Sequence, residues 1–189
     1  MKNNEINELA AELWSEHEKA LSALFLHRPG LRGEIANNLR ELIDWDKYVP
    51  ASEQNRERNI VIFPKTWNKI PVQQSGNETW GGPRVLGFQF ENLPEKKQLD
   101  LMLIIGPSSD SKTREELAKK VFKHFRMTKP EKRARYKIKT WLILTKEDFE
   151  KSESELFKKI KSKWNVIEKE IKKDVPKILK ITTVSAESN

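Results

Sequence analysis

The segment from Arg84 to Gly106 constrains the fold more than any other part of this chain. Residues 84–92, RVLGFQFEN, alternate loosely between apolar and polar side chains, and residues 99–106, LDLMLIIG, form the most apolar run of the sequence. Each run has the length and composition of a β-strand, and the polar segment LPEKKQ between them has the character of a hairpin connection. We therefore expect two antiparallel neighbouring strands.

The spacing of apolar side chains predicts the other elements. Two further apolar or β-branched runs predict strands at 59–64 and 136–144. Helical periodicity predicts helices at about 5–26, 31–44, 113–127 and 146–173, the last one ended by Val175 and Pro176. The segment 45–58 shows no such pattern and is interpreted as a loop.

Together these elements predict the fold class α+β, with a small, mainly antiparallel sheet packed with an N-terminal helical pair and a long C-terminal helix. A chain of 189 residues fits one domain. We expect that domain to cover 1–180, with a helical part at 1–45, a sheet with an inserted helix at 59–144 and the C-terminal helix at 146–175. Residues 181–189 should form a frayed tail.

Composition excludes several classes of protein. There is no cysteine, so disulfides and thiolate metal sites are excluded. No apolar run approaches the roughly 18 residues that a membrane helix needs, and the N-terminal residues lack the basic and apolar regions of a signal peptide. We therefore expect a cytoplasmic protein without a membrane partner.

The strongest local signal is the segment 119–139, called the basic window below. It contains ten Lys or Arg and one acid, Glu131, a net charge of +9 in a chain whose total is +8. Such a cluster can neutralise phosphates of DNA or RNA. The predicted nucleic-acid-binding residues are Lys119, Lys120, Lys123, Arg126, Lys129, Lys132, Arg133, Arg135, Lys137 and Lys139.

Aromatic residues lie among these cations. Phe122, Phe125 and Tyr136 can stack on bases, as aromatic side chains do in single-strand-binding proteins. Phe122 and Phe125 can equally form the buried face of a helix. The basic window itself can also be a solvated basic face, so both alternatives stay open here.

The segment GPSSDSKT resembles a phosphate-binding P-loop, G-x-x-x-x-G-K-[ST], with Ser111 in place of the second glycine. A P-loop opens a parallel sheet, and a later strand supplies an acid for magnesium. Here the preceding strand lies in a predicted hairpin, and Thr145 follows the one later strand. We interpret the segment as a strand-to-helix turn, with Thr113 as the helix cap and Glu116 completing a capping box.

Carboxylates that could hold magnesium in a nuclease are Glu91 and Asp100, at the end of one predicted strand and the start of the next. No E-x-K follows on a strand, so the set is incomplete. The sequence therefore predicts no catalytic residue, no metal ligand and no cofactor, and a divergent magnesium-dependent nuclease remains the third alternative for function.

The pattern GFQFEN…LDLMLIIGPSSDSKTREELAKKVF resembles the C-terminal, non-catalytic region of PD-(D/E)XK nuclease superfamily proteins of bacteria and phages. In that frame, an F-x-F-E strand pairs with an L-x-L-x-IGP strand, matched here by Gly106 and Pro107, and an Arg follows near the start of the next helix, matched by Arg114. The resemblance covers roughly 41–179. It implies an accessory domain without the nuclease core, in phage defence or phage biology.

The leading interpretation is thus a non-catalytic domain that binds DNA or RNA through the basic window. Trp67 and Trp80 are candidates for an adjacent interface, since tryptophan is enriched at binding hot spots. The alternative is a protein-interaction module, an inhibitor or subunit that binds an acidic partner through the C-terminal helix and exposed tryptophans.

Overall fold

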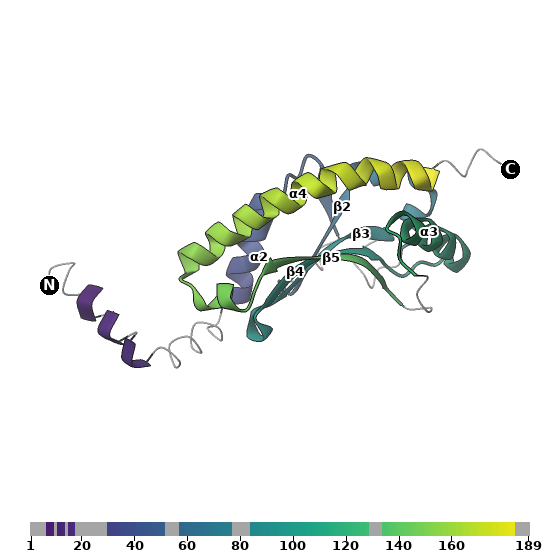
Figure 1. Cartoon of the computed structure of the whole chain (residues 1–189). Coiled ribbons are helices and arrows are strands. Elements are labelled where there is room, and N and C mark those ends of the chain that lie inside the picture. Colours follow the sequence, from purple (N-terminus) through teal and green to yellow (C-terminus); the bar gives the residue numbers. More distant parts are fainter. Residues whose placement is uncertain are drawn as a thin grey trace.

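A computed structural model describes residues 7–9, 11–13, 15–17, 30–51, 57–76, 84–128 and 134–183 of this chain. The fold is α+β, as the sequence predicts: a five-stranded antiparallel sheet with helices along one face. Figure 1 shows the long helix α4 (Glu153–Thr183) lying across the sheet.

The strands follow one another in the sheet in the order of the sequence, β1-β2-β3-β4-β5. Their bounds are Tyr48–Pro50 for β1, Asn59–Pro64 for β2, Leu86–Leu93 for β3, Gln98–Ile105 for β4 and Tyr136–Leu144 for β5. The predicted hairpin is confirmed, because β3 and β4 pair antiparallel over their full length, from Leu86 opposite Ile105 to Leu93 opposite Gln98. A single turn of 3-10 helix, η4 (Pro94–Lys96), joins them.

Strand β1 lies in the segment predicted to be a loop, so that prediction is wrong. Only three residues, Tyr48 to Pro50, pair with Ile62 to Pro64 of β2. A three-residue strand that ends in proline carries too little alternation to be recognised, and proline is tolerated there because β1 is an edge strand.

Two further α-helices and three 3-10 helices complete the described fold. Their bounds are Leu31–Leu42 for α2, Ser111–His124 for α3, and Lys65–Lys69, Pro71–Ser75 and Glu147–Glu150 for the 3-10 helices η1, η2 and η5. Residues 7–9, 11–13 and 15–17 are helical, within the predicted helix 5–26, whose other residues lie outside the described part of the chain. The strands predicted at 59–64 and 136–144 are confirmed.

Helix α4 begins and ends later than predicted. Its start is set by Ser152 and Glu155, because the Ser152 N–H donates to Glu155 at 3.2 Å while the Glu155 N–H donates to Ser152 Oγ at 3.4 Å, a capping box. The prediction that Val175 and Pro176 end it is wrong, since the helix continues to Thr183. Beyond the proline, Ile178 is buried in the main core, and this packing holds the last turns of the helix against the sheet.

The two faces of the sheet differ in what covers them. Side chains alternate between faces along each strand, and one set packs with α2, α3 and α4 into the main core; we call this the helix-covered face. From the strands it includes Ile60, Ile62, Phe88, Phe90, Leu101 and Leu103, and from α4 it includes Leu156, Ile160, Trp164, Ile167 and Ile171. The other face, called the opposite face, has a smaller apolar cluster of Ala51, Val61, Phe63, Met102 and Ile104.

Candidate nucleic-acid interface

The basic window does not form one continuous element. Lys119, Lys120 and Lys123 lie in α3, Arg126 follows it, Arg135 precedes β5, and Lys137 and Lys139 lie within β5. Lys129, Lys132 and Arg133 lie outside the described residues. The described cations therefore come from two elements, which meet where the ring of Phe122 packs edge-on against the ring of Tyr136 at 5.7 Å.

Lys119 and Lys123 of α3, and Arg126 just after it, are exposed cations. Lys119 and Lys123 are four residues apart, so they lie on one side of the helix, and Arg126 follows just after the helix end. All three side chains are exposed, as is Arg135 beyond the end of α3. Within the part of the chain that the structure describes, these four cations have no acidic partner in an ion pair. Lys120 differs from them, because it is half-buried and already has an interaction partner.

Arg126 has a left-handed backbone, with φ of 54°. This position ends α3: the Arg126 N–H donates to the Lys123 carbonyl at 3.2 Å and the Met127 N–H to the Phe122 carbonyl at 3.0 Å. Glycine is the usual residue there because a Cβ atom is disfavoured at positive φ. An arginine at this place therefore carries a conformational cost.

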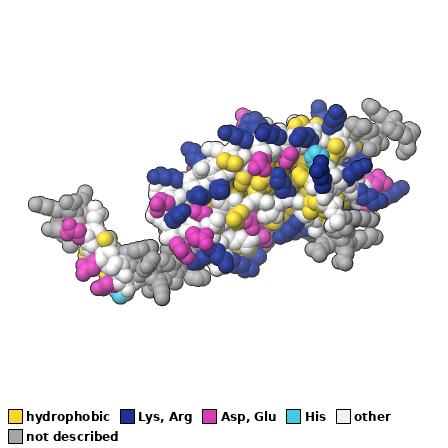
Figure 2. All heavy atoms as spheres, in the orientation of Figure 1, with side chains coloured by type: hydrophobic (Ala, Val, Ile, Leu, Met, Phe, Trp, Pro, Cys, Tyr) yellow, Lys and Arg dark blue, Asp and Glu magenta, His cyan; other side chains and the backbone are white. Residues whose placement is uncertain are grey.

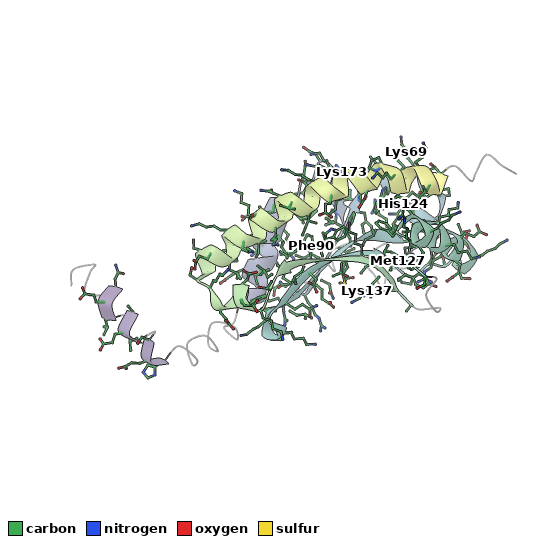
Figure 3. The ribbon with its side chains drawn as sticks, in the orientation of Figure 1. Lys69, Phe90, His124, Met127, Lys137 and Lys173 are labelled. Carbon is green, nitrogen blue, oxygen red and sulfur yellow. The ribbon has the colours of Figure 1, made fainter. Side chains whose placement is uncertain are left out.

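A β-bulge separates Lys137 from Lys139. Leu103 pairs with Lys139 whereas its neighbour Ile104 pairs with Lys137, so Ile138 is the extra residue. Without the bulge, residues two apart would lie on the same face. With it, Lys137 lies on the opposite face, away from α4, as Figure 3 shows, and Lys139 lies on the helix-covered face.

Lys139 is ion-paired within the fold, unlike the exposed cations of α3. Its Nζ lies 3.3 Å from Glu170 and 3.6 Å from Asp174 of α4, and 4.6 Å from the ring centre of Trp141. Hydrogen bonds from Trp141 Nε1 and then from Lys139 lower the pKa of Glu170 below its ordinary value. This lysine therefore helps attach α4 to β5.

The aromatic residues of the basic window belong to the core. Phe122 and Tyr136 are buried, and Phe125 packs half-buried against the same cluster. The Tyr136 hydroxyl donates to Glu115 at 2.5 Å, and the guanidinium of Arg114 lies 4.4 Å from its ring centre. These rings are held by their neighbours, so of the two alternatives for them burial is confirmed.

A pocket of about 240 Å³ opens beside the start of β5. We call it the β5 pocket. It is lined by Gln89, Glu91, Ile104, Phe122, Arg135, Tyr136 and Lys137. Its polar side chains come from β3 and β5 and its apolar ones from β4, β5 and α3, so it joins the opposite face of the sheet to the end of α3.

Arg114 holds together the elements around this pocket. Its side chain is nearly buried, and its Nε donates to the Gly106 carbonyl at 2.6 Å while one terminal nitrogen donates to the Ala134 carbonyl at 3.0 Å. The end of β4, the start of α3 and the residues before β5 are thus linked by one guanidinium. Gly106 and Arg114, two residues of the family-like motif, therefore make a structural contact.

The P-loop-like segment is a strand-to-helix turn, as predicted, but its cap is Asp110 and the assignment of Thr113 as cap is wrong. The Asp110 side chain accepts from the Thr113 N–H at 3.0 Å, and hydrogen bonds from the Thr113 side chain and then from its N–H lower the pKa of Asp110. Nearby, the Ser109 N–H donates to the Ser75 carbonyl at 2.8 Å. The Asp110 carboxylate at the helix start opposes an anion there, and the amides of Ser109 and Thr113 are already hydrogen-bonded.

Glu91 and Asp100 lie directly opposite each other on β3 and β4. Between them, the Gln98 amide nitrogen lies 2.7 Å from Asp100 Oδ2 and 3.5 Å from Glu91 Oε2. The region that a cation would need is therefore filled by a hydrogen-bond donor. No group of three or more His, Cys, Asp or Glu side chains within the described ranges could hold a metal ion.

The prediction that Trp67 lies at an exposed interface is also wrong. Trp67 is fully buried, stacks on Phe88 with ring centres 5.4 Å apart, and donates from Nε1 to the Val175 carbonyl at 3.1 Å. Trp80 lies outside the described residues. The apolar stripe of α4, which the protein-interaction alternative needs, is buried in the main core.

Comparisons with protein-family models, curated proteins and solved structures gave no match to this chain. In the described part of the chain, no helix combines the length and the apolar character needed to cross a membrane.

Proposed function

We propose that this protein binds nucleic acid without catalysing a reaction, through Lys119, Lys123, Arg126 and Arg135, with Lys137 beside them. One observation carries the proposal: four exposed cations, two in α3, one just after it and one just before β5, have no acidic partner among the described residues. Unpaired cations are free to replace the counterions of a phosphate backbone, which gives salt-dependent affinity.

Other parts of the protein surface are also basic, so affinity at this site has to exceed general attraction to a polyanion. Figure 2 shows Lys and Arg side chains over the length of the visible face, with acidic side chains among them. Helix α4 alone carries nine lysines and five acids. General attraction between a basic protein and a polyanion must therefore be separated from a specific contact at α3 and β5.

The test is fluorescence anisotropy with labelled single- and double-stranded DNA and RNA over a salt series. In the site variant, Lys119, Lys123, Arg126 and Arg135 are all changed to Glu. The control changes four exposed lysines of α4 to Glu and so has the same net charge; its residues are Lys158, Lys161, Lys163 and Lys169.

We expect the site variant to lose binding and to lower the log–log salt slope by about 3 to 4 for duplex. The control should retain most of the affinity. Equal losses in both variants would contradict a specific site, and absence of binding even at low salt would contradict nucleic-acid binding altogether.

The same cations could also bind an acidic protein partner, and this alternative predicts a different experimental result. A stoichiometric complex that survives nuclease treatment and is lost in the site variant would indicate a protein-interaction module. Magnesium-dependent cleavage that an Asp100→Ala variant loses would indicate the nuclease alternative.

The resemblance to the accessory region of PD-(D/E)XK proteins adds a setting to this proposal, phage defence or phage biology in the cytoplasm. A structural contact supports it: Arg114 bonds the carbonyl of Gly106, so the two motif positions act together. In this setting the domain would present nucleic acid to a nuclease core supplied elsewhere.

A further inference from the structure

We propose that the β5 pocket binds one unpaired base of a single-stranded nucleic acid, with Arg135 and Lys137 on the flanking phosphates and Glu91 accepting a hydrogen bond from the base. This inference rests on the proposed function, because it assigns to that interface the form of nucleic acid and the base it prefers. The pocket changes from cationic at its rim to apolar at its floor, with a carboxylate between them.

The rim is cationic. Arg135 is exposed without an acidic partner among the described residues, and the Lys137 side chain is 62% exposed. Lys137 Nζ forms an ion pair with Glu91 Oε2 at 3.9 Å, which is too long for a hydrogen bond, so its N–H groups can still donate to an anion. Two cations next to each other at the mouth of a pocket suit the phosphates on either side of one nucleotide.

The wall of the pocket carries one accessible carboxylate. The Glu91 side chain is 23% exposed, and its nearest donor is the Gln98 amide at the long distance of 3.5 Å. Gln89, also in the pocket, is buried and donates to Asn59 Oδ1 at 3.1 Å. Glu91 is therefore the group in this wall that is placed to accept a hydrogen bond from a ligand.

The floor is apolar and rigid. It consists of the buried side chains of Ile104, Phe122 and Tyr136. The Tyr136 ring is fixed on one side by Arg114 and at its edge by Phe122, and its hydroxyl is bonded to Glu115. Because these three side chains are buried, a base that enters the pocket meets a fixed apolar floor and not an aromatic ring that is open for stacking.

The size of the pocket limits its ligand. About 240 Å³ is below the roughly 300–1,000 Å³ of pockets that hold drug-sized ligands, so we assign one base to it and no larger group. A base within a duplex is stacked and paired and cannot enter. The occupant is therefore an unpaired base, as in single-stranded recognition.

The carboxylate predicts which base. Cytosine and adenine present an amino donor at the position where thymine presents a carbonyl oxygen. A carboxylate accepts from an amino group and repels a carbonyl, so the pocket should prefer cytosine or adenine over thymine. Guanine also offers donors on its Watson–Crick edge, but its tendency to form quadruplexes makes it a poor probe.

The experiment compares labelled oligo(dC), oligo(dA) and oligo(dT) of equal length, with a duplex as competitor, by fluorescence anisotropy at fixed salt. We expect oligo(dC) and oligo(dA) to bind about tenfold more tightly than oligo(dT). The Glu91→Gln variant should lose this preference, because an amide both donates and accepts. The control Glu150→Gln makes the same charge change at an exposed site paired with Lys97, and should keep the preference.

A second variant, Lys137→Gln, separates the phosphate contact from the base contact. It should weaken all three oligonucleotides by similar factors and leave the preference among them unchanged. Circular dichroism of each variant establishes that the fold is retained.

The outcomes distinguish this inference from the function on which it rests. Salt-dependent binding with equal affinity for the three oligonucleotides, or a preference that Glu91→Gln retains, overturns the base pocket and leaves nucleic-acid binding in place. If no oligonucleotide binds at low salt, the proposed function fails and the pocket assignment fails with it.

Discussion

The two faces of the sheet show how one run of basic residues can serve two purposes. On the helix-covered face, Lys139 is enclosed by Glu170, Asp174 and Trp141 and helps attach α4. On the opposite face, Lys137 is largely exposed at the rim of a pocket. The two lysines are two residues apart, and a single bulge residue between them decides which face each one reaches.

This difference indicates where stability and binding are located. The helix-covered face holds the large aromatic and aliphatic core, whereas the opposite face combines a small apolar cluster with polar groups and an exposed Leu142. We therefore expect changes on the first face to alter stability and changes at α3 and the β5 pocket to alter binding. Four predictions test that division, in order of decreasing size.

The largest effect is expected for Trp67→Ala. This residue is fully buried and donates a hydrogen bond to the Val175 carbonyl, so its loss should lower the free energy of unfolding by about 3–5 kcal/mol in urea titrations. The control Trp45→Ala removes a partly exposed ring and should cost less than about 1 kcal/mol. Similar losses for the two variants would contradict the assignment of Trp67 to the core.

Arg114→Lys should lower the free energy of unfolding by about 2 kcal/mol, because an ammonium cannot make both of the carbonyl hydrogen bonds to Gly106 and Ala134. It should also weaken binding, since Ala134 precedes Arg135 at the pocket rim. The matched control is Arg84→Lys, whose hydrogen bond to Asn68 is exposed. Full stability in Arg114→Lys would show that the guanidinium does not link these elements.

Arg126→Gly separates stability from binding most directly. It relieves the left-handed backbone and should raise the free energy of unfolding by about 1 kcal/mol while lowering affinity for nucleic acid. Thermal unfolding and anisotropy measure the two effects. A variant that is less stable and binds normally would indicate that Arg126 serves only to stabilise the end of α3.

The smallest effect concerns the pH dependence of the helix-covered face. Since the folded-state pKa of Glu170 is lowered, its contribution to stability is present above the unfolded-state pKa and is lost as the pH falls through the folded-state pKa. The half-exposed carboxylate is screened by solvent, so Glu170→Gln should cost less than about 1 kcal/mol at neutral pH. Urea titrations should show the gap between the two proteins close in acid, and a gap that stays constant would exclude Glu170 as its cause.

Much of the fold could be predicted from local pattern. The β3–β4 hairpin, β2, β5 and the three helices each carry a complete apolar repeat within one segment, and such repeats depend only on neighbouring residues. The start of α3 was misassigned, because Asp110 and Thr113 are both good capping residues and only the backbone conformation distinguishes them. Strand β1 and the last turn of α4 depend on distant partners, Ile62 to Pro64 for β1 and the main core for Ile178.

The candidate site was less predictable than the fold. The basic window was visible as charge, but which of its cations are free depends on acids of α4 that lie about 30 residues further along the chain. The burial of Trp67 was not predictable from its neighbours in the sequence either, because it depends on contacts with Phe88 and Val175.

By itself, then, the sequence determined the class of the fold, the antiparallel hairpin at its centre and the place in the chain where positive charge is concentrated. The tertiary structure alone decided that Lys137 and Lys139 lie on different faces, that Trp67 belongs to the core and that Glu91 shares a pocket with Arg135. The physical reason is the separation of the interacting residues along the sequence. Hydrophobic periodicity and net charge are properties of short segments, whereas burial, pairing and pocket formation require residues that only folding brings together.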